Sequence, residues 1–230
     1  TYSFYKVWAE LYRIPYECPA LDGDFRIVKE DYYRENGGII FPNPNAPTAI
    51  YEELDFIEDI LEHNRDSIVI VDEAYVDFAG RSAMELIGKY DNLIVTQTFS
   101  KARSLAGMRI GYAISNPDLI RCLNDVKYSF NSYTMSRAAI VCGSAAVEDR
   151  AYFEKSVRRI KETRERTKEE LAKLGFEFTD SKANFLFARH PRYDGGQLFR
   201  ELRDANIHVR HWDDEKIGQY LRITVGTDEE

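Results

Sequence analysis

The chain has 230 residues, of which 44% are hydrophobic and 13% aromatic, so it is long enough to bury a substantial core. Its net charge of −8 disfavours general binding to nucleic acid, and no apolar run approaches the roughly 20 residues that cross a bilayer. Three scattered cysteines and four histidines without metal-binding spacing argue against a disulfide framework and a metal site, so a cytoplasmic location is expected.

The first 145 residues alternate between segments typical of strands and helices. Apolar periodicity and turn residues first predict a helix over 3–12, a short strand leading to a loop over 13–21, and a strand-like start followed by a short helix over 24–37. A strand from 38, a helix over 51–64, a buried strand up to 71 and a short helix over 81–90 follow. Buried strands over 92–100 and 108–115 and a helix over 116–127 complete this part. This order predicts an α/β fold with a mainly parallel sheet flanked by helices.

The pattern changes near residue 145. A long charged helix over 148–175 is followed by strands over 183–190, 206–212 and 219–226 and by a helix over 195–206. We therefore predict a large domain over 1–145 and a smaller α+β domain over 146–230. Because the chain begins in an amphipathic segment and ends directly after a strand-like run, we expect it to be a fragment of a longer protein.

Polar clusters follow three of the predicted strands: PNPNAPT, DEAY and TFSK. Because ligands of such sheets bind beyond the carboxyl ends of the strands, these clusters predict one shared site. Asp72 ends the apolar run IVIV, where a carboxylate is costly unless it is paired or hydrogen-bonded. It can cap a helix, form a structural ion pair, or hold a buried cation such as a protonated ring nitrogen. Tyr75 is either a core tyrosine or a donor to a ligand oxygen.

Lys101 follows a strand that contains no other charge, so it is either a surface lysine or a nucleophile for a carbonyl. Arg109 can form a surface ion pair or grip a phosphate, which Thr98 and Ser100 can share. Together with Asp72, these residues are the groups that pyridoxal phosphate requires: a lysine for the aldehyde, a carboxylate for the ring nitrogen, and cationic and hydroxyl groups for the phosphate.

With these residues the chain resembles the fold-type I pyridoxal-phosphate aminotransferases of class I/II. The resemblance rests on NPNAPT (43–48), VDEAY (71–75), TFSKARSLAGMRIGYAI (98–114), ANFLFAR (183–189) and YLRITVGT (220–227). It implies transamination between an amino donor and a 2-oxo acid, most specifically histidinol phosphate and 2-oxoglutarate in histidine biosynthesis. It also implies a homodimer. Another pyridoxal-phosphate enzyme, such as an aromatic or general aminotransferase or a phospho-amino-acid decarboxylase, and a catalytically silent truncated domain remain alternatives.

The resemblance also implies roles for individual residues. It implies that Lys101 is the Schiff-base lysine and that Asp72 is the partner of the ring nitrogen. Tyr75 and Asn45 would contact the ring oxygen, Ser100 and Arg109 would bind the phosphate, and Tyr2 would stack on the ring. Arg210 and Arg222 would be the substrate-binding arginines. The sequence departs from the family in two ways. Ala46 and Ala49 replace asparagine and glycine in the usual Asn-Asn-Pro-Thr-Gly loop, and the family's N-terminal segment, with its phosphate-binding turn, is not in this chain.

Overall fold

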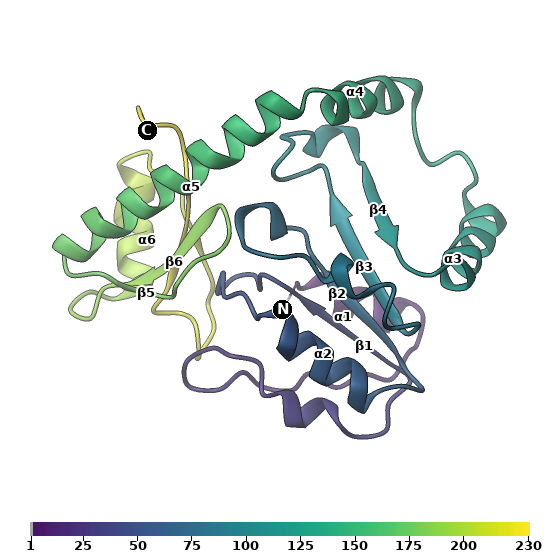
Figure 1. Cartoon of the computed structure of the whole chain (residues 1–230). Coiled ribbons are helices and arrows are strands. Elements are labelled where there is room, and N and C mark those ends of the chain that lie inside the picture. The colour runs from purple at the N-terminus through teal and green to yellow at the C-terminus, as the bar shows by residue number, and fades with distance from the viewer. Residues whose placement is uncertain (1) are drawn as a thin grey trace.

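The computed structural model describes residues 2–230, which form two four-stranded sheets connected by helices (Figure 1). The first sheet has the order β1-β2-β3-β4, with β1 at Gly38–Pro42, β2 at Ile68–Asp72, β3 at Leu93–Thr98 and β4 at Gly111–Ile114. Strands β1, β2 and β3 are parallel, whereas β4 is antiparallel to β3. The predicted fold class, a mainly parallel sheet flanked by helices, is confirmed.

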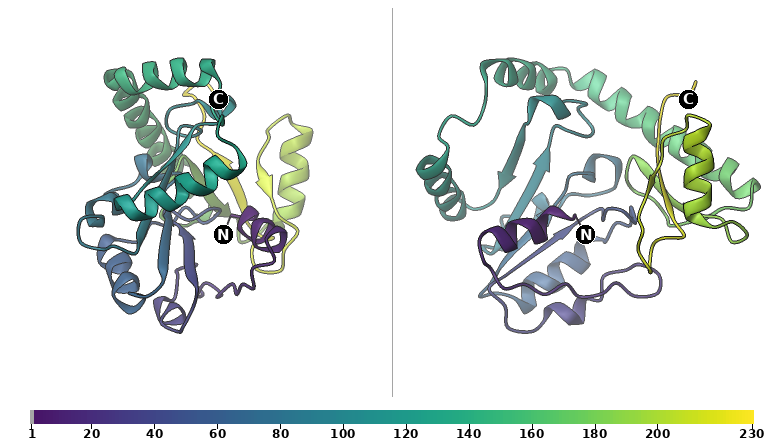
Figure 2. Two further views of the ribbon diagram at one scale, coloured as in Figure 1. Left: turned by 90° about the vertical axis from the view of Figure 1, so that its right-hand side faces the viewer. Right: turned by 180° about the vertical axis from the view of Figure 1, so that it is seen from behind.

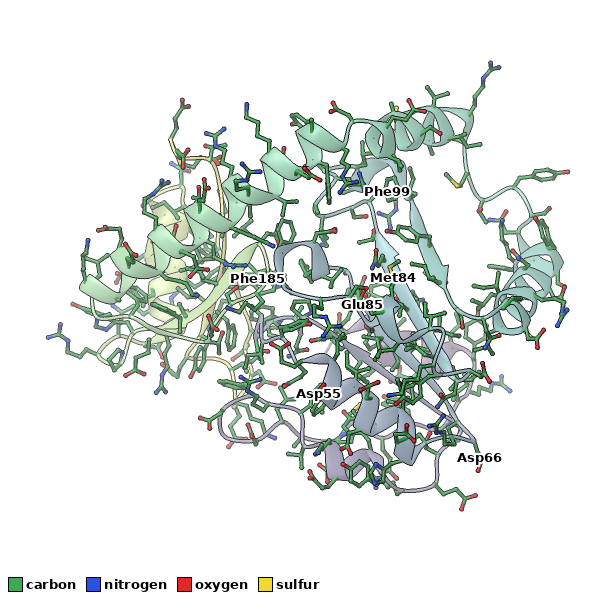
Figure 3. The ribbon with its side chains drawn as sticks, viewed as in Figure 1. Asp55, Asp66, Met84, Glu85, Phe99 and Phe185 are labelled. Carbon is green, nitrogen blue, oxygen red and sulfur yellow. The ribbon has the colours of Figure 1, made fainter. Side chains whose placement is uncertain are left out.

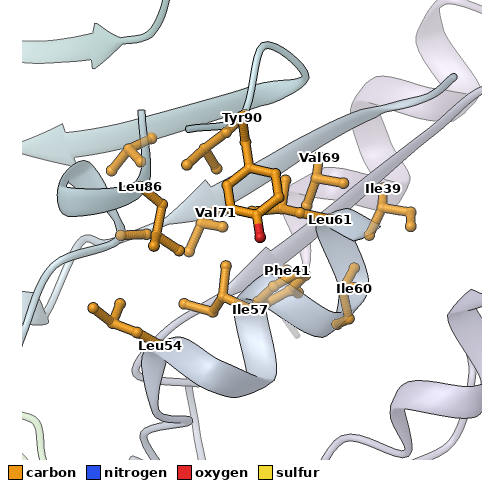
Figure 4. Packing of buried hydrophobic residues seen from close by; sticks show 13 residues of the cluster. Ile39, Phe41, Leu54, Ile57, Ile60, Leu61, Val69, Val71, Leu86 and Tyr90 are labelled. Carbon is orange, nitrogen blue, oxygen red and sulfur yellow. The ribbon is translucent and has the colours of Figure 1, made fainter. Parts of the chain in front are cut away.

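The main core lies between the first sheet and helix α2 (Leu54–His63). Apolar side chains from β1, β2 and β3 contact the α2 residues that recur at helical spacing, as Figure 4 shows. The buried members are Ile39, Phe41, Leu54, Ile57, Ile60, Leu61, Val69, Val71, Ala83, Leu86, Tyr90, Leu93 and Val95. Their burial holds the carboxyl ends of β2 and β3 side by side, and these ends carry the candidate site residues.

Helix α1 (Phe4–Leu11) lies on the opposite side of the first sheet from α2 (Figures 1 and 2). None of its residues is fully buried. The sequence predicts a buried strand here, but β2 alternates between buried and more exposed positions, and Ile68 is exposed. The reason is that α2 covers one face of the sheet closely, whereas the short α1 covers little of the other.

The second sheet is antiparallel and has the order β5-β6-β8-β7. Its strands are β5 (Glu177–Phe178), β6 (Phe185–Arg189), β7 (Arg210–His211) and β8 (Leu221–Thr224), and its helices are α5 (Arg150–Lys173) and α6 (Gly195–Asp204). Phe185 of β6 (labelled in Figure 3) packs in one buried cluster with Ala183 and with Ala49, which lies in the loop that follows β1. The predicted division at residue 145 stays a prediction; that position lies within α4 (Arg137–Glu148).

Several predicted elements were wrong. Residues 13–21 form no strand, because Pro15 and Pro19 lack the N–H groups that a sheet requires. The short helices predicted within 24–37 and over 81–90 are present as the 3-10 helices η1 (Lys29–Tyr32) and η3 (Ala83–Leu86), whereas the strand-like start of 24–37 forms no strand. Helix α4 was not predicted, because its small residues give weak apolar periodicity. The helix predicted over 116–127 is confirmed as α3 (Pro117–Phe130), which begins at the Asn116 cap.

Helices α3 and α4 expose many large apolar side chains, and α3 stands away from the first sheet at one side of the molecule (Figure 1). The exposed residues on and between the two helices are Leu123, Val126, Tyr128, Phe130, Tyr133, Met135, Ile140, Val141 and Val147. Large apolar side chains exposed in such number are typical of an interface. Within residues 2–230, no helix is both long enough and apolar enough to cross a membrane.

Candidate active site

A cleft of about 390 Å³ lies between the loops that follow β2 and β3 and the face of β6 and β8. It is lined by Tyr75, Ser100, Lys101, Ser104, Ala106, Asn184, Phe185, Arg222 and Thr224. Four of the predicted site residues, Tyr75, Ser100, Lys101 and Arg222, are therefore brought together. Asn184 and Phe185 were not predicted as site residues, because they are distant in sequence from the loops after β2 and β3; Ser104, in the loop after β3, was also not predicted.

Lys101 lies in the turn after β3 and is half-buried. Its Nζ is 5.1 Å from the centre of the Tyr75 ring, and within residues 2–230 it forms no ion pair or hydrogen bond. The Tyr75 ring packs edge-on against Phe185, with 5.1 Å between ring centres. The amine of Lys101 is thus held beside an aromatic wall and is available to react with a ligand in the cleft.

Asp72 ends β2, and both of its carboxylate oxygens accept hydrogen bonds. The Ala74 N–H donates to Oδ1 at 3.1 Å, and the Tyr5 hydroxyl donates to Oδ2 at 2.5 Å. Burial and the nearby Asp72 charge raise the pKa of Tyr5 far above its usual range, so its hydroxyl stays protonated. Sequence reasoning missed Tyr5. Its only signal is its position in the predicted helix over 3–12, three residues after Tyr2.

Tyr2 precedes α1, and its ring is about half exposed. It packs edge-on against the Tyr5 ring, with 5.6 Å between centres, and is stacked on Phe4 at 5.8 Å. Because Tyr5 reaches Asp72, this contact places Tyr2 near the carboxyl end of β2. Tyr2 and Asp72 do not line the cleft around Lys101.

The predicted phosphate ligands follow β3. The Ser100 N–H donates to Thr98 Oγ1 at 3.1 Å, so the two hydroxyl side chains are adjacent. Arg109 ends the 3-10 helix η4 (Ala106–Met108) in the left-handed conformation, with φ of 56°. Its guanidinium is exposed and donates to the Ala106 carbonyl at 2.9 Å. Arg109 therefore lies beside the cleft wall at Ala106 but does not line the cleft.

Asn45 is buried within the loop after β1 and does not line the cleft. Its side-chain amide donates to Thr48 Oγ1 at 2.7 Å, and its carbonyl accepts from the Ala49 N–H at the same distance. The structure thus shows Asn45 shaping this loop. Ala49 has a left-handed φ of 61°, the backbone conformation that glycine adopts most readily.

The predicted substrate arginines are neighbours on the second sheet. Arg222 of β8 lines the cleft, with its guanidinium 5.1 Å from the Phe185 ring centre and 5.8 Å from that of Trp212. Its Nε is buried without a hydrogen-bond partner. Arg210 of β7 is exposed and lies 5.5 Å from the Trp212 ring. Within residues 2–230 neither arginine forms an ion pair, so this side of the cleft is suited to an anion.

Comparisons with known proteins show the family to which the chain is related. The family described as aminotransferase class I and II matches residues 1–230. The chain is 54% identical over 229 residues to a histidinol-phosphate aminotransferase of Pseudomonas putida and 53% identical over 230 residues to one of Lactococcus lactis subsp. cremoris. These alignments cover the whole chain but only 66% and 65% of the relatives, so the chain spans about two thirds of their length.

Solved structures show the same fold. The histidinol-phosphate aminotransferase of Clostridium acetobutylicum matches with a TM-score of 0.90 at 24% identity, over 100% of this chain and 72% of that one. That of Sinorhizobium meliloti, in complex with pyridoxal-5'-phosphate, matches with a TM-score of 0.81 at 24% identity, over 92% of this chain and 60% of that one.

Proposed function

Because the chain belongs to the aminotransferase class I and II family, we propose that it carries the lysine and the substrate arginines of a pyridoxal-phosphate-dependent aminotransferase. The observation that supports this most directly is the unpaired amine of Lys101, in a cleft that also holds the unpartnered Nε of Arg222. A lysine nucleophile and a cation for an acidic substrate group are the two parts that the reaction cannot lack.

The residues present fit pyridoxal phosphate. When bound, this group supplies an aldehyde for the lysine and a ring that withdraws electrons from the substrate. Lys101 would hold the aldehyde carbon and then move a proton with its freed amine. Asp72 would accept the ring N–H, Tyr75 would donate to the ring oxygen, and Ser100 with Arg109 would bind the phosphate. Of the residues given these roles, Lys101, Tyr75 and Ser100 line the cleft, whereas Asp72, Arg109, Tyr2 and Asn45 lie outside its lining.

We propose histidinol phosphate as amino donor and 2-oxoglutarate as acceptor, because relatives at 53–54% identity are named for the former. Arg222 and Arg210 support this choice. The donor's phosphate and the acceptor's distal carboxylate must bind in turn at one site, and the planar guanidinium matches both anions. Phe185 and Tyr75 would exclude water from the amine of Lys101. The competing hypothesis is a domain without catalytic activity, since the chain spans 66% of a relative's length.

We also propose a cytoplasmic homodimer. The large apolar side chains exposed on and between α3 and α4 support self-association, because such side chains often mark interfaces between protein chains. An open apolar groove beside α4, lined partly by Phe99, Ile110 and Met135, includes the exposed Ile140 and Val147 of that helix. Light scattering during gel filtration tests this: a mass of twice 26.7 kDa supports the dimer, and a monomer contradicts it.

The test of the catalytic proposal is an absorption spectrum of the protein with pyridoxal phosphate, before and after borohydride, followed by peptide mapping. We expect a band near the visible edge that Lys101→Ala abolishes. Lys161→Ala is the matched control, because Lys161 is also half-buried but donates to the Ala79 carbonyl outside the cleft. Turnover of histidinol phosphate with 2-oxoglutarate then tests the substrates. Absence of the band from wild-type protein contradicts the proposal for this chain.

A further inference from the structure

We infer that Tyr5 is a positioning residue for Asp72, fixing the orientation of its carboxylate and sharing its negative charge by donating a hydrogen bond. The inference rests on the proposed function, in which Asp72 binds the ring nitrogen of the cofactor. It extends the site to α1, a helix that supplies no residue to the cleft wall.

The contact has the geometry of a strong, charge-assisted hydrogen bond. The Tyr5 hydroxyl lies 2.5 Å from Asp72 Oδ2, and the two residues are separated by 67 positions in the chain. With Ala74 N–H on Oδ1, each oxygen accepts one donor. A carboxylate offers about four lone-pair sites, so Asp72 keeps the capacity to accept a further N–H.

The hydrogen bond is also the specific link between α1 and the first sheet. Helix α1 has no fully buried residue, and in the described part of the chain no other side chain of this helix hydrogen-bonds to the sheet. Tyr5 is itself more buried than Phe4 or Trp8, whose rings remain about half exposed. The helix is thus oriented by the contact that it makes with the carboxylate.

The direction of donation is fixed. Burial, and next the Asp72 charge, raise the pKa of Tyr5, so the hydroxyl does not ionise in the working range. The neighbouring Tyr2 acts in the same direction. Tyr5 is therefore a permanent donor, and it reduces the negative charge that Asp72 presents to other protonated groups at the site.

The test uses Tyr5→Phe, which removes the hydroxyl and keeps the ring. We expect the dissociation constant for pyridoxal phosphate to rise about tenfold, because the carboxylate is no longer held in one orientation. We also expect the pH midpoint of the Lys101-dependent absorption band to rise by roughly 0.5 pH unit, since the full Asp72 charge then stabilises protonated groups nearby. A purely structural role for Tyr5 predicts no shift of this midpoint.

Tyr33→Phe is the matched control, because the Tyr33 hydroxyl donates to Asp59, a carboxylate on α2 away from the cleft. It should leave both quantities unchanged. Coupling is tested in an Asp72→Asn background, where adding Tyr5→Phe should shift the midpoint no further. If the pH midpoint of the band and the dissociation constant for pyridoxal phosphate in Tyr5→Phe equal those of the wild type, the inference is overturned but the proposed function is not. Absence of the absorption band from the wild-type protein overturns the proposed function, and this inference with it.

Discussion

Arg210 and Arg222 lie directly opposite each other on the antiparallel strands β7 and β8. Like charges at such a pair of positions destabilise a sheet, and no acidic side chain within residues 2–230 forms an ion pair with either. Trp212 contacts both guanidinium groups through its ring, which offsets part of the repulsion. The free protein therefore holds two cations in an arrangement that an incoming dianion would stabilise.

Arg222→Met should remove phosphate binding without unfolding the protein. The substitution deletes one of two repelling charges and the unpartnered Nε, so we expect the melting temperature in phosphate-free buffer to stay equal or rise. The stabilisation that added inorganic phosphate provides should be lost almost entirely. Thermal unfolding across a phosphate titration measures both. Arg189→Met is the control, because Arg189 pairs with Glu177 at 2.8 Å; an intact phosphate response in Arg222→Met contradicts the prediction.

Trp212 should control how tightly the site binds anionic substrates. Trp212→Ala removes the ring that both guanidinium groups contact, and each such contact is worth about 0.5–2 kcal/mol. We expect calorimetry to show that histidinol phosphate binds about tenfold more weakly. Trp212→Phe keeps a smaller aromatic face and should lose less affinity. Equal losses in the two variants would show that the aromatic contact is not the cause.

The sequence predicted the parts of the site that local patterns encode. The apolar run IVIV ended by Asp72 predicted the end of β2, and the position of Lys101 after an uncharged strand predicted a polar side chain at the sheet edge, either a surface lysine or a nucleophile. Both residues lie at the predicted edge because parallel strands align their carboxyl ends. The antiparallel direction of β4 was not predicted, since the composition of a short strand does not determine its direction.

Contacts between distant segments were beyond local patterns. The hydrogen bond from Tyr5 to Asp72 joins residues 67 positions apart, and α1 was recognised only by its apolar stripe. Phe185 closes the cleft from the second sheet, and no spacing rule connects it to Tyr75. Asn45 shows that residue type alone can also mislead. An asparagine fits a ligand contact, but in the folded protein its side chain donates to Thr48 instead.

Asp228 should make stability depend on pH in the acid range. Its carboxylate accepts hydrogen bonds from Arg166, Thr163 and Arg159 of α5, which lower its pKa from 3.8 to about 2. Because the folded-state pKa lies below the unfolded value, the stabilisation is present above about pH 4 and is lost as the pH falls towards 2. The stability gap between wild type and Asp228→Asn should narrow over that window in urea unfolding. Asp213→Asn, at an exposed position without an ion pair among the described residues, should show no such gap.

Ala49 should tolerate glycine but not valine. Its φ of 61° costs about 1–2 kcal/mol for an L-residue, which glycine would relieve. Glycine also loses a buried methyl contact worth about 0.8 kcal/mol with Ala183 and Phe185, and gains chain entropy on unfolding worth about 0.4–1 kcal/mol. These terms nearly cancel, so Ala49→Gly should change the unfolding free energy by less than about 1 kcal/mol. Ala49→Val adds a branched side chain at a fully buried, left-handed position and should cost about 2–4 kcal/mol. Urea unfolding of both variants measures the difference; a loss above about 2 kcal/mol in Ala49→Gly would mean that methyl packing, and not backbone conformation, determines the residue at this position.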